Sequence, residues 1–324
     1  YIEKAPMFLR DDAMKLRSFI KKHVKYGDKK NLMYRIDHGK IKPSKNLADN
    51  LESLLKGNEE FLMIDDQKVV YERSLNLALK SESGEKNVIV VEGGPGTGKS
   101  VVAVNLLVKS IARNLNSRYI TKNSAPRQVY EAKLLNSFKK SRISNLFSGS
   151  GSFTETEKNY YDFLIVDEAH RLNEKSGLFS KGENQIKEII NSSKCSIFFI
   201  DENQKVTFKD IGEKGEIEKW AKKLGAKITR LKLESQFRCN GSDGYLAWID
   251  DTLQIRDTAN TMFDTSDYDF EIVDTPQKLH AIIKKKNTNN KARVVAGYCW
   301  NWISKENPLL KDIVIGDYKA TWNL

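Results

Sequence analysis

The fold of this chain is most constrained by a glycine-rich segment, Gly93 to Ser100, that separates an apolar run from a helical pattern. Residues 87–91 predict a buried strand, because four of the five are β-branched and none is charged. Beyond the glycines, apolar residues recur at helical spacing: Val102, Ala103, Leu106, Leu107 and Ile111. Strand, glycine turn and helix in this order predict that the N-terminus of the helix faces whatever the turn binds.

The spacing of Gly93, Gly98, Lys99 and Ser100 is that of a phosphate-binding loop, or P-loop. In such a loop the backbone wraps the phosphates, the lysine reaches the β and γ oxygens, and the hydroxyl binds Mg²⁺. The segment therefore predicts a nucleotide site, with Lys99 and Ser100 binding together with the residues before them: Gly94, Pro95, Gly96, Thr97 and Gly98.

A second apolar run, residues 163–166, ends in the adjacent carboxylates Asp167 and Glu168. A strand of a parallel sheet is buried on both faces, so continuous apolar residues are typical of it. Asp167 is expected to hold Mg²⁺ together with Ser100, while Glu168 orients and deprotonates the attacking water. His170 follows them, either as a relay towards a nucleic-acid site or as an ordinary loop histidine.

Three further side chains are expected to contact the nucleotide. Gln67 begins a predicted helix, and its amide offers donors and an acceptor that match adenine. Gln204 follows the strand 196–200 and is expected to sense the γ-phosphate. Arg238 follows the strand 228–233 and is expected to act as an arginine finger.

Polar and cationic residues after the predicted strand 118–121 are expected to contact a nucleic-acid backbone. These are Lys122, Asn123 and Arg127, at the sheet edge where ligands of open α/β sheets bind. The run 121–124 also resembles the guanine-reading pattern of GTPases, but Ser124 stands where that pattern needs an aspartate. ATP is therefore the expected nucleotide.

Composition excludes several classes of protein. No apolar run is as long as a membrane span, and the first residues lack the layout of a signal peptide, so a cytoplasmic location without membrane partners is expected. The three cysteines are far apart and predict neither a disulfide framework nor a zinc site. The net charge of +11 suits a polyanionic partner, or equally lysines on solvated faces.

Five predicted strands alternate with helices around the P-loop, which predicts an α/β fold with one parallel, RecA-like core. We expect a helical N-terminal region over residues 1–80, a RecA-like ATPase domain over 81–238, and the start of a second, incomplete RecA-like domain over 239–324. The prediction for the second domain rests on strands at 271–273, 293–296 and 312–315 and on a helix near Leu279.

The order of these motifs is similar to motifs Q, I, Ia, II, III and IV of superfamily 1 helicases. The phrases IDDQKVVYE, EGGPGTGKSVVA, DEAHRLNEKSG, FFIDENQ and ESQFRCNGSDGYLAWID resemble the Schlafen group 3-like DNA/RNA helicase domain family. By that resemblance, Gln67 would bind adenine, Gln204 the γ-phosphate, and Arg238 would be the finger.

The family pattern continues into a motif V of the HTxQGLEFD kind and an arginine-bearing motif VI, which the printed sequence does not reach. If both motifs are absent, the second domain is incomplete, and unwinding is not expected even where nucleotide binding survives.

Two functions are consistent with the sequence. The first is an ATP- and Mg²⁺-dependent motor or remodeller acting on single-stranded DNA or RNA. The second is a nucleotide-switched regulatory module, serving a nuclease or other effector outside this chain, that neither translocates nor unwinds. Stimulation of hydrolysis by single strands distinguishes the first from the second.

Overall fold

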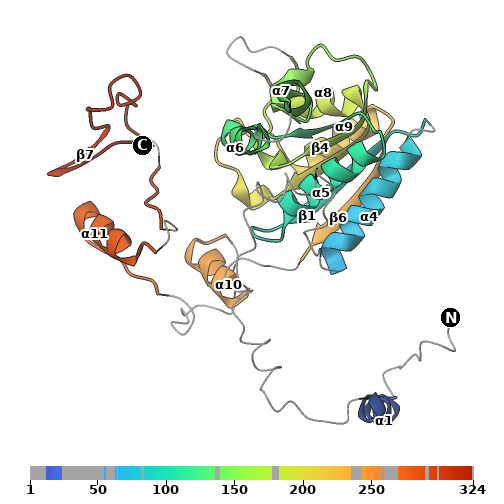
Figure 1. Cartoon of the computed structure of the whole chain (residues 1–324), viewed down its shortest axis with the longest axis horizontal. Coiled ribbons are helices and arrows are strands. Elements are labelled where there is room, and N and C mark those ends of the chain that lie inside the picture. The colour runs from blue at the N-terminus through green and yellow to red at the C-terminus, as the bar shows by residue number, and fades with distance from the viewer. Residues whose placement is uncertain are drawn as a thin grey trace. The chain divides into compact units, whose positions relative to one another are not determined.

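The computed structural model describes residues 12–23, 55, 63, 65–81, 84–135, 139–176, 182–234, 243–255, 257–258, 269–288, 292–297 and 299–322. The chain divides into two compact units, Tyr1–Asp257 and Thr258–Leu324, which are described separately (Figure 1).

The first unit is built on a six-stranded parallel sheet. Its strands are β1 (Asn87–Gly93), β2 (Ser117–Ile120), β3 (Phe147–Ser148), β4 (Tyr161–Val166), β5 (Ser193–Ile200) and β6 (Lys227–Leu233), in the order β3-β2-β4-β5-β1-β6. The predicted α/β, RecA-like P-loop fold with a parallel sheet is confirmed. The sequence did not predict β3, because a strand of two residues has no recognisable period.

The α-helices of this unit lie before β1 and after most of its strands. They are α1 (Ala13–His23), α4 (Asp65–Lys80), α5 (Lys99–Ala112), α6 (Ser124–Leu134), α7 (Lys140–Ser144), α8 (Gln185–Ser192), α9 (Lys214–Lys223) and α10 (Asp243–Thr252). Short 3₁₀ turns occupy Ser150–Phe153, Ala169–Arg171 and Glu202–Gln204. In the part of the chain that the structure describes, no helix combines the length and the apolar character needed to cross a membrane.

Helices cover both faces of the sheet, which explains why its strands are continuously apolar. On β5, Ile197 and Phe199 pack in the cluster that includes α4 and α5, whereas Phe198 and Ile200 pack in the cluster that includes α8 and α9. Figure 1 shows α4 and α5 side by side over one face of the sheet. All four β5 side chains are fully buried.

The pairing register brings the carboxyl ends of β4, β5 and β1 to the same edge of the sheet. Phe198 of β5 lies opposite both Val90 of β1 and Val166 of β4, so β5 separates the P-loop strand from the strand that ends at Asp167. Ligands of open parallel sheets bind at the carboxyl ends of the strands. The P-loop, Asp167 and the residues after Ile200 therefore meet at one edge.

Some predicted elements differ from the structure. The Gly-Ser-Gly-Ser composition of residues 149–152 predicts a flexible loop, but Ser150–Phe153 form a 3₁₀ turn in which Ser150 and Phe153 are buried. Pro43 and Ser44 predict the start of an N-terminal helix with Leu51 and Leu55 on one stripe. Of these residues the structure describes only Leu55, which packs against the core.

The second unit contains α11 (Pro276–Lys286) and an antiparallel hairpin of β7 (Ile313–Ile315) and β8 (Tyr318–Ala320). Thr275 caps α11 by accepting a hydrogen bond from Lys278 N–H. The strands predicted at 271–273 and 293–296 are wrong, since both segments are described and neither pairs as a strand. An apolar pattern in one segment does not show whether a neighbouring strand is present to pair with it, and a strand forms only with such a partner.

Asp210 ties together three loops at the carboxyl edge of the first unit's sheet. Its side chain is fully buried, and its carboxylate lies 3.0 Å from Lys122 Nζ after β2 and 3.0 Å from Arg171 Nε after β4. It also accepts hydrogen bonds from the N–H groups of Val206 and Thr207 after β5. One carboxylate thus holds the loops after β2, β4 and β5 together.

Burial by itself raises the pKa of Asp210, but hydrogen bonds from the Thr207 N–H, Lys122 and the Val206 N–H lower it by more. The net pKa lies well below the ordinary value. A group with a depressed pKa in the folded state adds stability above its unfolded pKa and loses it as the pH falls through the folded pKa.

We expect Asp210→Asn to reduce the free energy of unfolding by about 3 kcal/mol at pH 7, because it leaves two partly buried cations without their carboxylate. The difference in free energy of unfolding between this variant and the unaltered chain should be the same at pH 5 as at pH 7. It should become smaller only below about pH 4, near the ordinary aspartate pKa. Urea unfolding at each pH measures this difference. A difference that has already vanished at pH 5 would contradict the depressed pKa.

Candidate functional site

The backbone of the P-loop is shaped by glycines. Gly96 and Gly98 adopt left-handed conformations with φ of 81° and 85°, which only glycine adopts without strain. A Cβ at Gly93 would lie 2.6 Å from Thr97 Oγ1, so the turn is too tight for a side chain there. Gly98 begins α5 without a side-chain cap, so no side chain competes for the first N–H groups of the helix.

Lys99 lies at the mouth of this loop and is almost fully buried. Its Nζ donates to the carbonyl oxygens of Gly93 and Gly94 at 2.7 and 2.8 Å. It also lies 3.9 Å from Asp201 Oδ2, after β5. A buried ammonium group is thus held where the phosphates of a nucleotide would bind.

Ser100 and Asp167 come together although they stand on separate elements. Ser100 Oγ donates to Asp167 Oδ2 at 2.6 Å. Burial raises the pKa of Asp167, while hydrogen bonds from Ser100 and Tyr119 oppose that shift. The structure places the two predicted metal ligands in direct contact.

This pair fits Mg²⁺, which is often bound by one or two protein oxygens together with substrate phosphates rather than by an all-protein cage. Among the described residues, no group of three or more His, Cys, Asp or Glu could hold a metal ion. Ser100 and Asp167 are the residues that would hold the ion.

Glu168 adopts a left-handed backbone conformation, with φ 54° and ψ 44°, that is uncommon for a residue with a side chain. Its carboxylate lies 2.9 Å from His170 Nε2, and its side chain is 31% exposed. His170 Nδ1 accepts from the backbone N–H of Asp201 at 3.4 Å. Because a backbone N–H can only donate, the neutral imidazole carries its hydrogen on Nε2 and donates it to Glu168.

A close backbone contact supports this turn. At Gly212 a Cβ would overlap the carbonyl oxygen of Ala169, so only glycine allows the segment after β5 to lie against the turn that carries Glu168. The structure thus connects His170, which the sequence left open, to both Glu168 and the end of β5.

Gln204 stands close to Lys99 through a shared partner. Its Nε2 donates to Asp201 Oδ2 at 2.8 Å, and the same oxygen faces Lys99. Asp201 Oδ1 accepts from Asn203 N–H, which fixes the turn. A displacement of the Lys99 ammonium group would therefore act on Gln204 through Asp201, which contacts both side chains.

Gln67 packs directly against the P-loop. It is buried, and its Nε2 donates to the carbonyl oxygen of Thr97 at 3.0 Å. A Cβ at Gly98 would overlap that amide. One amide hydrogen of Gln67 is therefore used by the loop, and adenine recognition by this residue stays a prediction.

The predicted nucleic-acid contacts are not equivalent. Lys122 is engaged internally, donating to Asn173 Oδ1 at 2.9 Å as well as to Asp210. Asn123 is the N-cap of α6 but makes no side-chain cap bond, and Arg127 lies over Gly149. Arg238 lies outside the described residues.

An exposed apolar loop after β5 was not predicted. Phe208 is fully exposed and Val206 is 69% exposed, on the loop that Asp210 holds through its backbone. Lys205 and Lys209 flank these side chains. The signal in the sequence was an aromatic residue between lysines in the segment that follows a strand, in no helical or strand period.

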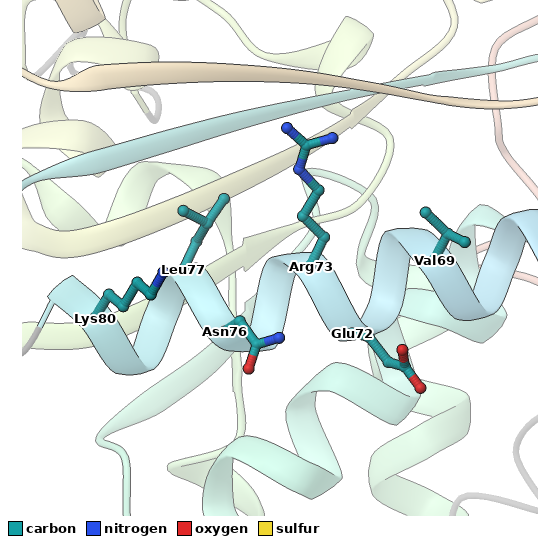
Figure 2. A pocket seen from close by; sticks show the side chains of 6 residues that line it. All are labelled: Val69, Glu72, Arg73, Asn76, Leu77 and Lys80. Carbon is teal, nitrogen blue, oxygen red and sulfur yellow. The ribbon is translucent and has the colours of Figure 1, made fainter. Parts of the chain in front are cut away.

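A hollow of about 410 Å³ lies along α4 (Figure 2). It is lined by Val69, Glu72, Arg73, Asn76, Leu77 and Lys80. All six belong to one helix, and none belongs to the P-loop or to the ends of β4 and β5, so the hollow is separate from the phosphate site.

Comparisons with known proteins agree with these motifs. The family described as "Schlafen group 3, DNA/RNA helicase domain" matches residues 86–324, which confirms the resemblance of the sequence phrases within that range. No curated protein matches the chain.

Solved structures resemble the chain only distantly. Domain III of the replication initiation protein DnaA from Thermotoga maritima is 17% identical with a TM-score of 0.31, over 60% of this chain and 72% of that one. A DNA replication initiation factor is 16% identical with a TM-score of 0.31, over 61% and 54%. AMPPCP-bound DnaA from Aquifex aeolicus is 17% identical with a TM-score of 0.30, over 62% and 56%. The chain thus spans little more than half of the last two.

The family match, in contrast, runs through the P-loop, Asp167 and the loop after β5, and it takes in most of the chain. The protein belongs to the Schlafen group 3 DNA/RNA helicase domain family.

Proposed function

We propose that this chain binds ATP with Mg²⁺ and hydrolyses it in response to single-stranded nucleic acid. The observation that carries the proposal is the 2.6 Å hydrogen bond between Ser100 and Asp167. It joins a P-loop hydroxyl to a carboxylate directly after β4, a strand that does not neighbour β1 in the sheet. This is the pairing that a nucleotide-bound Mg²⁺ requires.

The residues divide the work of phosphoryl transfer. Lys99 and the N–H groups at the start of α5 bind the phosphates, and Ser100 with Asp167 holds the ion, which neutralises charge on the phosphates when it is bound. Glu168 takes a proton from the attacking water. His170 orients the Glu168 carboxylate through the 2.9 Å contact.

Contacts between loops support coupling of hydrolysis to a partner. His170 touches both Glu168 and the backbone of Asp201, and Asp201 in turn touches Lys99 and Gln204. The loop that follows Gln204 carries the exposed Phe208. A short series of contacts therefore connects a ligand bound to that loop with Glu168, the residue proposed to activate water.

A single strand is the partner that suits this loop. Exposed aromatic rings stack on bases without reading their sequence, and flanking cations attract the phosphates. Phe208 is such a ring next to Lys209, and the chain carries a net charge of +11. The proposal covers both DNA and RNA as the single strand and includes motor activity along it. It also assigns contacts with the strand backbone to Asn123 and Arg127.

The alternative is a nucleotide switch without nucleic-acid coupling. Its specific support is that Lys122, an expected phosphate contact, is held by Asp210 and Asn173. A switch of this kind would hydrolyse ATP at a rate that single strands do not change.

We expect Glu168→Gln to lower ATP turnover by about 10²- to 10⁴-fold while ATP still binds, because only the general base is lost. Lys99→Ala should abolish turnover and weaken ATP binding. Phosphate release and equilibrium nucleotide binding measure both effects. Glu157→Gln, at an exposed glutamate on the amino side of β4, is the matched control and should behave as the unaltered chain. Normal turnover in Glu168→Gln would refute the assignment.

We expect Phe208→Ala to weaken binding of single-stranded oligonucleotides by about 1–3 kcal/mol, or about 5- to 150-fold in Kd, through loss of one stacked base. Fluorescence anisotropy at constant salt measures this. Tyr160→Ala is the control, since Tyr160 is also an exposed aromatic but lies at the amino end of β4. Equal affinities for the two variants would remove Phe208 from the binding surface.

A further inference from the structure

Tyr119 is a buried tyrosine that none of the motifs includes. It lies on β2, is 1% exposed, and its hydroxyl donates to Asp167 Oδ2 at 2.5 Å. The same oxygen accepts the hydrogen bond from Ser100 at 2.6 Å. Two hydroxyls from different elements therefore converge on one oxygen of the predicted metal ligand.

The tyrosine ring is held by its packing. Its centroid lies 6.0 Å from that of Tyr130 on α6 and 5.8 Å from that of Phe147 on β3, both in edge-on arrangements. In the sheet, Tyr119 is in register with Ile165 of β4, two residues before Asp167. The position of the hydroxyl is thus set by the core, and the carboxylate aligns to it.

Burial next to Asp167 raises the pKa of Tyr119 well above its usual value, so its hydroxyl keeps its hydrogen. That hydrogen is donated to Asp167, while the Tyr130 ring of α6 packs against the Tyr119 ring. The Tyr119 hydroxyl is thus a donor to the Asp167 carboxylate from within the core.

Asp167 Oδ1 is also engaged, accepting from the Glu168 N–H at 3.0 Å. The carboxylate is therefore oriented from both sides, by the backbone at one oxygen and by two hydroxyls at the other. Because Ser100 points its hydrogen at Asp167, the lone pairs of its oxygen remain available to a cation.

We infer that Tyr119 is a positioning residue for the metal site: its hydroxyl holds the Asp167 carboxylate in the orientation that binds the nucleotide's Mg²⁺. The inference rests on the proposed function. Hydrogen bonds that orient a metal ligand from outside the coordination sphere commonly contribute a factor of about 10 to 100 in metal affinity. Tyr119 makes such a bond to a buried carboxylate.

The test is Tyr119→Phe, which removes the oxygen and keeps the ring. The readout is binding of a fluorescent, non-hydrolysable ATP analogue, titrated with Mg²⁺ from a chelator-treated start. We expect the Mg²⁺ midpoint to rise by about 10- to 100-fold, with binding at saturating Mg²⁺ preserved. Tyr161→Phe makes the same change at another buried tyrosine of the sheet and should leave the midpoint unchanged.

Tyr130→Phe removes the hydroxyl of the ring that packs on Tyr119 and leaves the bond between Tyr119 and Asp167, so its Mg²⁺ midpoint should shift far less. An unchanged midpoint in Tyr119→Phe, or an equal shift in Tyr130→Phe, would overturn the inference while leaving the proposed function intact. An unaltered chain that shows no Mg²⁺-dependent nucleotide binding would instead contradict the proposed function and the inference with it.

Discussion

The hydrogen bond between Ser100 and Asp167 is the contact on which the rest of the site depends. It forms because β4 and β1 lie on either side of β5 and end at the same edge of the sheet, so that the start of α5 meets the residue after β4. Burial of Asp167 at this point raises its pKa, and hydrogen bonds from the Ser100 and Tyr119 hydroxyls oppose that rise. The fold thus provides a buried carboxylate whose hydrogen bonds favour its charged form, which is the form that binds a cation.

Around this contact, the loops at the carboxyl edge of the sheet are linked by a few polar side chains. His170 connects Glu168 to the end of β5, and Asp201 connects Lys99 to Gln204. Asp210, outside every motif, holds the loops after β2, β4 and β5. The exposed Phe208 therefore lies on a loop whose backbone Asp210 holds. Polar contacts connect that loop with the P-loop and with the turn that carries Glu168.

Contiguous features could be predicted from the sequence, whereas features made by tertiary contact could not. The P-loop, the strands β1, β4 and β5, and the carboxylates of Asp167 and Glu168 follow from short runs of residues, and the parallel sheet follows from their alternation with helices. Tyr119 and Asp210 carry no local signal, because their roles come from partners distant in the chain. The strands predicted at 271–273 and 293–296 failed for the same reason, since an apolar pattern does not specify a pairing partner.

The central claim is that this P-loop fold hydrolyses ATP under the control of a single strand. The most direct test is the steady-state rate of phosphate release by the unaltered chain, measured with Mg²⁺ at constant salt, with and without single-stranded DNA and single-stranded RNA. The account predicts a low basal rate that at least one of the two strands raises. A rate that neither strand changes, together with no binding of labelled strands at moderate salt, would contradict it and favour the nucleotide switch.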